Sequence, residues 1–283
     1  MKLGYLTNFS EDELKLASNI GFDGLEVHAK SWAADDLQSP DRRAEASARA
    51  SELAGRYGIT VTAIAHYERG NPADPKARIE SYRSVIEFCS AMKVPVVATL
   101  TGGDPDAGLE DNVKLWTNTF SEVARIAEAS GVKVAFENWP GFGAIPPCRS
   151  VNFGFSPTAW EMMFDAVDSP ALGLEFDPSH LVWQQADYLS AAKRFGSRIH
   201  HVHLKDTEIM EDKLAEHGSF GGGWWRYRIP GFGLVDWMGF FSVLYEIGYD
   251  GGTAIEHEDG VFSGPKRADG LKLGYEYLRP MIL

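Results

Sequence analysis

The chain has 283 residues, of which 44% are hydrophobic and 24% are charged, and its formal net charge is −13. A chain of this length forms either one large α/β barrel or two domains of average size. The acidic balance argues against a nucleic-acid partner, because binding to phosphate groups requires clustered Lys and Arg.

The cysteines and the N-terminal segment indicate where the protein works. Cys89 and Cys148 are its two cysteines and show no Cys-x-x-Cys spacing, which excludes a disulfide framework and a zinc finger and fits a reducing cytosol. The chain starts with MKLGYLT rather than the apolar segment of a signal peptide. No stretch reaches the roughly 18 apolar residues of a membrane span. We therefore expect a cytoplasmic protein with no membrane partner.

Strand-like and helix-like segments alternate along the chain. Apolar runs typical of buried strands lie at 2–6, 24–29, 59–66, 95–101, 132–138, 172–178, 199–205 and 253–258. Amphipathic stretches typical of helices lie at 11–20, 41–57, 76–92, 110–130, 156–167, 187–196, 236–247 and 267–279. Gly58 and Gly131 stand where a helix would end before the next strand, and Ser10 and Ser156 stand where a helix would be capped.

Strict alternation of strand and helix predicts a single (β/α)8 TIM barrel domain over residues 1–283. A doubly wound open sheet is the alternative. That fold usually has a glycine-rich phosphate turn after its first strand, where this chain has TNFSED. Two loops, about 139–155 and about 207–235, are long and follow the fifth and seventh strands. Both leave carboxyl ends of strands, where a barrel has its active site.

Four predicted strands end in a residue that can bind a hard metal ion. The segments VKVAFEN, LGLEFDPSH, HHVHLKD and TAIEHED present, in that order, Glu137, Asp177, His203 and Glu256. A charge at a strand end is costly in a core but expected at the mouth of a barrel. Any one of these residues could equally form an ordinary salt bridge. Together they predict one metal site, because clustered carboxylates repel one another unless a cation is present.

Three carboxylates and one imidazole favour a hard or borderline divalent ion. Four protein ligands also leave room for a substrate in an octahedral shell. A structural zinc site would instead have Cys and His ligands. We expect one ion per chain, Mn²⁺ first, with Mg²⁺, Co²⁺ or Zn²⁺ as alternatives.

Other polar and aromatic residues fall at or near the same strand ends. The candidates for substrate contacts are His180, His66, Lys205, Trp139 and Glu26. The aromatic face of Trp139 can stack on a sugar ring. His201 shares a face with His203 but lies one layer deeper, so we expect a hydrogen-bonded core histidine there.

The loop after the seventh strand contains GGGWWRYRIPGFG, from Gly221 to Gly233. Glycines allow movement, the Trp pair can cover a ligand, and Arg226 or Arg228 can hold an oxyanion, which is typical of a lid. A contact between copies in a homo-oligomer is an equally open interpretation.

From GFDGLEV through FEN, FDPSH, HVHLKD and PGFG to AIEHED, the chain resembles the xylose isomerase-like barrel superfamily, in particular its sugar phosphate isomerase/epimerase group. That group includes ketose 3-epimerases, hydroxypyruvate isomerase and inosose dehydratase. The resemblance implies metal ligands at Glu137, Asp177, His203 and Glu256. It also implies substrate contacts from His180 and His66. In the ketose epimerases, the glutamates matching Glu137 and Glu256 also form the acid/base pair.

The chain departs from the ketose epimerases in two places. It has Asn138-Trp139-Pro140-Gly141 after the strand-five glutamate, and Lys205-Asp206 where those enzymes have an Arg soon after the strand-seven histidine. The superfamily also contains a DNA-repair enzyme, endonuclease IV, which needs extra histidines, one of them on strand four. Strand four here ends in Thr99-Leu-Thr-Gly-Gly, so an endonuclease IV-like hydrolase is disfavoured.

These features predict an enzyme of carbohydrate metabolism that moves a proton next to a carbonyl. A keto-sugar or hydroxyketone would bind the metal through two oxygens, and Glu137 or Glu256 would remove the α-proton to form an enediolate. Return of the proton gives epimerisation or isomerisation, and loss of a β-leaving group gives a dehydratase or lyase. The tryptophans and the long loop favour a cyclic or glycosidic keto-sugar. A non-catalytic sugar-binding protein is the third alternative.

Overall fold

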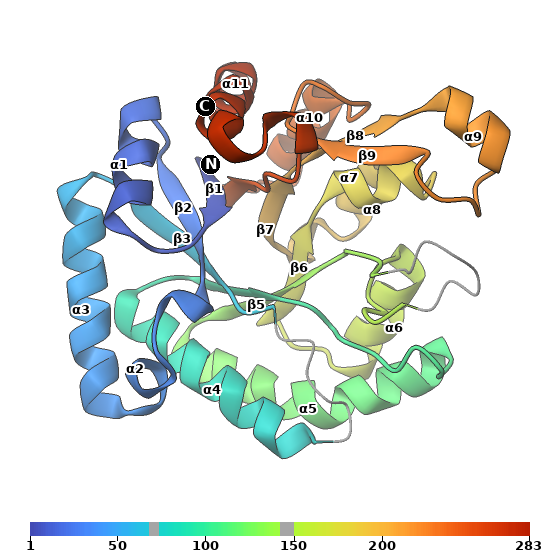
Figure 1. Ribbon diagram of the computed structural model, residues 1–283. Helices are drawn as coiled ribbons and strands as arrows, with labels where there is room; N and C mark the ends of the chain where they lie inside the picture. Colours follow the sequence, from blue (N-terminus) through green and yellow to red (C-terminus); the bar gives the residue numbers. More distant parts are fainter. Residues whose placement is uncertain (68–73, 142–149) are drawn as a thin grey trace.

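The computed structural model describes residues 1–67, 74–141 and 150–283, which form a barrel of strands inside a ring of helices (Figure 1). Eight parallel strands close the barrel in the order β1-β10-β7-β6-β5-β4-β3-β2. Their bounds are Lys2–Thr7 (β1), Gly24–His28 (β2), Thr60–Ala65 (β3), Val96–Thr99 (β4), Lys133–Glu137 (β5), Leu172–Phe176 (β6), Ile199–Leu204 (β7) and Gly252–Ile255 (β10). The predicted (β/α)8 barrel is confirmed.

The long helices lie where the amphipathic pattern predicts them. They are α1 (Glu11–Ile20), α3 (Pro40–Arg56), α4 (Pro75–Met92), α5 (Leu109–Ser130), α6 (Pro157–Ala166), α8 (Tyr188–Arg194), α10 (Trp237–Glu246) and α11 (Arg267–Leu278). Ser10 and Ser156 cap α1 and α6 through their hydroxyl oxygens, as the sequence predicts. In the part of the chain described, no helix combines the length and the apolar character needed to cross a bilayer.

Short elements that the sequence did not predict occupy the loops. They are α2 (Ala34–Gln38), α7 (Pro178–Trp183), α9 (Glu211–His217), β8 (Asp206–Ile209) and β9 (Trp225–Arg228). Five 3₁₀ turns lie at Ala29–Ser31, Gly196–Arg198, Gly260–Phe262, Gly264–Lys266 and Arg279–Met281. Of the predicted long loop at about 139–155, residues 142–149 lie outside the described residues.

The long loop after β7 contains an antiparallel hairpin of β8 and β9 (Figure 1). Its Trp225 stacks on Trp183 of α7, with ring centroids 4.6 Å apart. Asp206 anchors the base of the loop, because its carboxylate accepts the N–H of Gly231 and the indole N–H of Trp237, both at 3.0 Å. The segment predicted as a lid therefore has an ordered, anchored base, and its movement stays a prediction.

The barrel interior is apolar on one side and polar on the other. Ala63, Ala98 and Ala135 on β3, β4 and β5 form a small apolar cluster with Val96. Small side chains on three adjacent strands leave space that longer side chains from the opposite strands can fill. Gly252 adds to this space, since a Cβ there would lie 2.5 Å from the Cβ of Thr62 and 3.0 Å from His201 Nε2.

The layer between the barrel and its helices is packed with aromatic rings, and Trp160 on α6 gives a test of it. Trp160 is fully buried, contacts the rings of Phe176 and Phe195, and donates its indole N–H to the Gly154 carbonyl at 2.7 Å. Trp160→Ala should lower the free energy of unfolding by about 3–5 kcal/mol, because it leaves a cavity and an unpaired carbonyl. Denaturant unfolding followed by circular dichroism measures this change.

The matched control is Phe220→Ala, because Phe220 is 74% exposed. We expect that substitution to change the unfolding free energy by no more than about 0.5 kcal/mol. Equal unfolding midpoints for the two variants would contradict the packing described for Trp160.

Candidate metal and active site

The carboxyl ends of β5, β6, β7 and β10 bring four ligand-type side chains together. One ligand atom from each of Glu137, Asp177, His203 and Glu256 lies within 4.8 Å of the others. We call this set the upper cluster. Glu137, Asp177 and His203 are buried, and the side chain of Glu256 is 15% exposed. The four residues predicted as metal ligands on separate strands thus lie side by side in the structure.

Local hydrogen bonds fix the direction of Asp177. Its Oδ1 accepts the backbone N–H of Ser179 at 2.8 Å and so caps α7. The amide of Asn138 accepts the backbone N–H of Asp177 at 2.7 Å and donates to its carbonyl at 2.9 Å. These bonds join the ends of β5 and β6 and leave Asp177 Oδ2 facing the upper cluster. The FEN and FDPSH segments are therefore joined by hydrogen bonds that fix the position of Asp177.

Two buried atoms of the upper cluster, Asp177 Oδ2 and His203 Nδ1, form no well-aligned hydrogen bond with the described residues, although each has charged neighbours at 3.3–3.4 Å. Leaving a buried polar atom unpaired costs about 1–3 kcal/mol, so such atoms in a native protein call for an explanation such as an ion. Three carboxylates and one imidazole are a donor set that suits a hard or borderline divalent cation. The residues present therefore fit a metal ion.

Lys205 is a buried cation at the edge of the upper cluster. Its Nζ lies 3.3 Å from Asp177 Oδ2 and 2.9 Å from Glu258 Oε2, and it also forms an ion pair with Glu256. Burial opposes the charge of Lys205, but Glu256, Glu258 and Asp177 raise its pKa well above the ordinary value. Burial likewise opposes the charge of Glu256, but Lys205 and His203 hold the pKa of Glu256 well below the ordinary value. Both groups are therefore charged at neutral pH.

His180 joins the upper cluster to the hairpin. Its Nε2 lies 3.2 Å from Glu137 Oε1 and 3.3 Å from Asp177 Oδ2. Its Nδ1 lies 2.7 Å from the hydroxyl of Tyr227 on β9, and the Tyr227 ring also lies 4.2 Å from Lys205 Nζ. The sequence analysis did not single out Tyr227, although the WWRYR segment that carries it was predicted to cover the site.

A second group of polar side chains, the lower cluster, lies deeper in the barrel. It consists of Glu26, Glu175, His201 and His203, which are all fully buried and have ligand atoms within 4.8 Å of one another. His201 is the hydrogen-bonded core histidine that the sequence predicts, with Nδ1 3.0 Å from Glu175 Oε1. Burial, together with the charge of Glu26, raises the pKa of Glu175 well above its ordinary value. The structure thus places Glu26 beneath His203.

Sequence reasoning missed Glu175 and Tyr67 of this deeper layer. The hydroxyl of Tyr67 lies 2.7 Å from Glu175 Oε2 and 3.2 Å from Glu26 Oε1, and it can donate its single proton to either carboxylate. One available signal was the charge inside the apolar strand LGLEF, since Glu175 lies two residues before Asp177 and so shares its face.

A cavity of about 220 Å³ opens over the upper cluster. Its walls are Tyr67, Leu100, Glu137, Trp139, Lys205, Glu256 and Glu258. Both glutamates of the predicted acid/base pair, together with Trp139 and Lys205, therefore face one space. Acidic groups, a cation and an indole ring are the surroundings in which a small polyhydroxy compound can be held.

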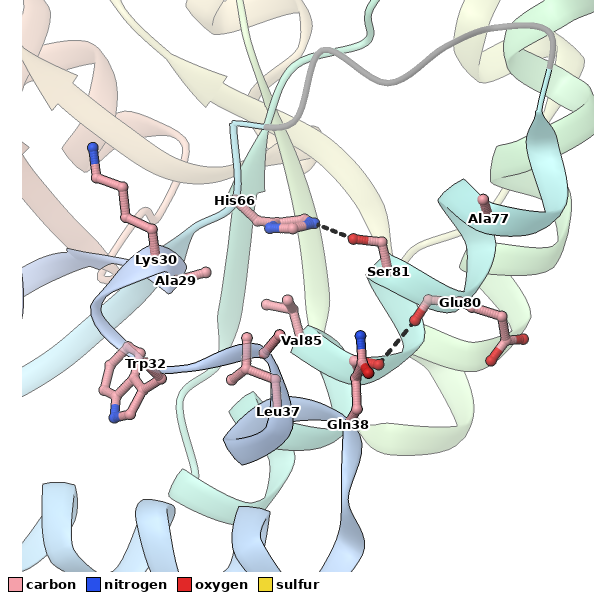
Figure 2. Close-up of a pocket in the computed structure, with 12 residues that line it drawn as sticks. Ala29, Lys30, Trp32, Leu37, Gln38, His66, Ala77, Glu80, Ser81 and Val85 are labelled. Atoms are coloured by element: carbon pink, nitrogen blue, oxygen red, sulfur yellow. Dashed lines mark hydrogen bonds between the residues drawn. The ribbon is translucent and has the colours of Figure 1, made fainter.

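The structure places two other candidates away from this cavity. His66 lines a separate cavity of about 750 Å³, together with Lys30, Trp32 and Ser81, and its Nε2 lies 3.0 Å from Ser81 Oγ (Figure 2). Arg228 donates from Nε to Asp259 Oδ2 at 2.8 Å and also pairs with Glu208. Substrate contacts from His66 and Arg228 stay predictions.

Binding of a divalent metal to the upper cluster should release a proton from His203. Burial opposes a charged imidazole, but Glu175, Glu26 and Glu256 raise the pKa of His203 well above its ordinary value in the metal-free protein. A metal requires the unprotonated nitrogen, so below that pKa the affinity should fall by up to about tenfold per pH unit as the pH is lowered.

Calorimetric titration with Mn²⁺ in buffers of different ionisation enthalpy measures the number of protons released. His217→Gln is the control, because His217 is an exposed residue of α9 and should not alter the proton count. A metal affinity that is independent of pH would contradict this prediction.

Comparison with known proteins identifies the family of this chain. A sequence model described as "Xylose isomerase-like TIM barrel" matches residues 14–281. The chain is 30% identical to "Uncharacterized protein YfiH" of Bacillus subtilis (strain 168), over 100% of this chain and 99% of that protein. It is 27% identical to an "Inosose dehydratase" of Clostridium beijerinckii, over 53% of this chain and 48% of that protein.

Among solved structures, D-psicose 3-epimerase with D-tagatose from Clostridium cellulolyticum H10 matches with a TM-score of 0.76 and 17% identity. The match covers 100% of this chain and 99% of that chain, and at this identity it shows a shared fold. The family match extends over nearly the whole barrel, including all four strand ends that form the upper cluster. The chain belongs to the xylose isomerase-like TIM barrel family.

Proposed function

We propose that the protein is a divalent-metal-dependent isomerase or epimerase that acts on a keto-sugar or hydroxyketone through an enediolate. One observation carries this proposal. Glu137 and Glu256, on the separate strand ends of β5 and β10, line the same cavity and belong to the same cluster as Asp177 and His203. Two carboxylates that face one substrate can move a proton between two positions on it.

The ligand set supports a resident ion as part of the proposal. Glu137, Asp177, His203 and Glu256 would hold one divalent ion, with Mn²⁺ first and Mg²⁺, Co²⁺ or Zn²⁺ as alternatives. When bound, the ion supplies Lewis-acid polarisation of the substrate carbonyl and offsets negative charge on the substrate oxygens.

The proton transfers would be carried out by the glutamates. Despite burial, Lys205 and His203 hold the pKa of Glu256 low, so Glu256 is available as a base at neutral pH. Glu137 lies 3.2 Å from His180 Nε2, and the imidazole can orient its carboxylate. Epimerisation follows when one glutamate removes the α-proton and the other, which carries a proton at the start, delivers that proton to the opposite face, so that the two glutamates exchange protonation states. Return to the neighbouring carbon gives isomerisation.

Other residues of the cavity would position the substrate. Lys205, which lines the cavity and carries a buried charge, would hold a substrate oxygen. His180 is fully buried and is not among the described residues that line the cavity, so a direct substrate contact from it stays a prediction. Trp139 would stack on the sugar ring from the cavity wall. The half-buried ring of Tyr227 would shield Lys205 on the hairpin side, where its centroid lies 4.2 Å from Lys205 Nζ.

A metal-dependent dehydratase or lyase on a cyclic or glycosidic keto-sugar is the second candidate. Two observations favour it: the likeness to an inosose dehydratase over about half of the chain, and the buried ammonium of Lys205 at the cavity, which could protonate a leaving hydroxyl. An endonuclease IV-like hydrolase is not proposed, because the described part of β4, VVAT, contributes no metal ligand to the mouth of the barrel. The proposed partner is a small sugar. A cytoplasmic location and a homo-oligomer stay predictions.

Product analysis with a panel of substrates separates the candidates. The metal-free protein would be loaded in turn with Mn²⁺, Mg²⁺, Co²⁺ or Zn²⁺ and incubated with D-psicose, D-tagatose, inosose and 3-keto-glucosides. NMR distinguishes a new epimer, an aldose and a dehydrated product. An epimer or aldose formed in a metal-dependent manner supports the first candidate, and loss of water supports the second. Turnover of a phosphodiester instead of any keto-sugar would reject both.

A further inference from the structure

One imidazole ring connects the two clusters inside the barrel. His203 Nδ1 faces the upper cluster, 3.4 Å from both Glu137 Oε1 and Glu256 Oε2. His203 Nε2 faces the lower cluster, 2.9 Å from Glu26 Oε2 and 3.2 Å from Glu175 Oε1. The group that hydrogen-bonds to Nε2 therefore also determines whether Nδ1 presents a proton or a lone pair to the upper cluster.

The clusters differ in how their polar atoms are satisfied. In the upper cluster, His203 Nδ1 and Asp177 Oδ2 form no well-aligned hydrogen bond within the described ranges. In the lower cluster, Glu26 has partners for both oxygens, in His203 and in the hydroxyl of Tyr67. Glu26 thus has a hydrogen-bond partner for each oxygen, whereas the upper cluster has two buried atoms without a well-aligned hydrogen bond, which an ion would satisfy.

The rest of the lower cluster also has hydrogen-bond partners. Glu175 Oε1 lies 3.0 Å from His201 Nδ1, and Glu175 Oε2 lies 2.7 Å from the Tyr67 hydroxyl, which it shares with Glu26. The second nitrogen of His201 lies 3.4 Å from the hydroxyl of Thr62. Glu26, Glu175, His201 and His203 are fully buried and Tyr67 is partly buried, so the hydrogen bonds among the first four compete little with bulk water.

We propose, on the basis of the function proposed above, that Glu26 is a positioning residue for the metal. Its carboxylate accepts the Nε2–H of His203 and thereby selects the imidazole tautomer whose Nδ1 lone pair faces the ion. A neutral imidazole carries a single N–H, so an acceptor at one nitrogen determines which nitrogen is free. A carboxylate acceptor also makes the imidazole a stronger ligand. Glu175, His201 and Tyr67 hold Glu26 in place.

This role differs from the direct substrate contact suggested by the sequence. Glu26 has no exposed surface, and the walls of the cavity over the upper cluster do not include it among the residues described. Its nearest cluster partner is the ring nitrogen that faces away from the cavity. Glu26 therefore acts through His203.

The first experiment measures metal affinity in two variants. Glu26→Leu removes the acceptor, and Glu26→Gln keeps the size and a weaker acceptor in case the leucine variant does not fold. We expect the Kd for Mn²⁺ to rise by about 10–100-fold in Glu26→Leu and by a smaller factor in Glu26→Gln. At saturating Mn²⁺, kcat should return toward the wild-type value. An unchanged Kd in both variants would overturn the proposal.

Thr99→Val is the matched control. Thr99 is fully buried on β4 and hydrogen-bonds to the Tyr82 hydroxyl and to the His66 carbonyl, so its loss also removes buried hydrogen bonds. This variant should lose stability but keep the wild-type Kd for Mn²⁺. Equal weakening of metal binding in Thr99→Val and Glu26→Leu would show a general structural effect and overturn the positioning role.

The second experiment observes the tautomer directly. Protein labelled with ¹⁵N in histidine and loaded with diamagnetic Zn²⁺ should show His203 coordinated through Nδ1 and carrying a slowly exchanging proton on Nε2, with the signals assigned by their loss in His203→Gln. Coordination through Nε2, or a second ion per chain whose binding requires Glu26, would overturn the proposal. If these results hold and no keto-sugar is turned over, the proposed function fails while the positioning role stands.

Discussion

Glu137→Gln and Glu256→Gln are each expected to reduce kcat for keto-sugar turnover by about 10²–10⁴-fold. Each glutamine keeps the size of the side chain and an oxygen that can face the ion, but it cannot accept a proton from carbon. The two glutamates line one cavity from opposite ends of the four-strand arc, β5 and β10, so neither can replace the other's position. Steady-state kinetics at saturating Mn²⁺, with metal content checked for every sample, measures the effect.

The single variants also make a finer prediction. If one glutamate serves each face of the substrate, each variant should stop interconversion of epimers but still exchange the α-hydrogen of one epimer. Glu161→Gln is the control, because Glu161 lies on the surface in an ion pair with Arg194 and should keep wild-type kcat. Wild-type turnover in Glu137→Gln would remove this residue from the proposed acid/base pair.

Removal of the metal is expected to abolish turnover, and one equivalent of Mn²⁺ per chain should restore it. The upper cluster has three carboxylates, of which Lys205 neutralises only part of the charge, and two of its buried atoms, Asp177 Oδ2 and His203 Nδ1, lack a well-aligned hydrogen bond among the described residues. A bound ion should also stabilise the fold, by about 2.7 kcal/mol when the free metal is at 100 times its Kd. Calorimetry, thermal unfolding and activity after chelation test these effects together.

Asp177→Asn is the variant paired with that experiment. It retains the shape that caps α7 but removes the charge at Oδ2, so the Kd for Mn²⁺ should rise while the barrel remains folded. Full turnover after exhaustive chelation, with no ion detectable by mass spectrometry, would contradict a metal-dependent reaction.

The barrel could be predicted because its signals are local. Each strand is a short apolar run with a glycine or a polar residue near its end. A strand that is buried on both faces requires an apolar composition, whichever strands lie beside it. The upper cluster could be predicted for the same reason, since parallel strands of a barrel all end at one mouth. The chain order of Glu137, Asp177, His203 and Glu256 was therefore enough to bring them together.

The lower cluster could be predicted only in part. Two-residue alternation places Glu26, Glu175 and His201 on the inner face of their strands, but it does not show which residues of neighbouring strands lie opposite one another. That depends on two irregularities, in which Thr62 on β3 and His200 on β7 are skipped in the pairing with β2 and β6. Glu26 and Glu175 follow these shifts directly and are the carboxylates that lie against His203 Nε2.

The hairpin was missed for a related reason. Only Lys205 separates the end of β7 from the start of β8, so the two strands are read as one strand end in the sequence. β9 follows a short helix, α9, that was not predicted. The sequence predicted that Arg228 lies in a segment over the site. It could not show that the guanidinium of Arg228 forms ion pairs with Asp259 and Glu208.

Hydrogen exchange with solvent tests whether Glu137 and Glu256 transfer a proton at the carbon next to the substrate carbonyl. The Mn²⁺-loaded protein would be incubated in D₂O with the substrate that it turns over, and the carbons next to the carbonyl would be followed by NMR after removal of the metal. Proton transfer through Glu137 and Glu256 predicts deuterium, or a transferred hydrogen, at the reacting α-carbon, and loss of this signal in the glutamine variants. Turnover that leaves every α-hydrogen in place would contradict proton transfer by Glu137 and Glu256.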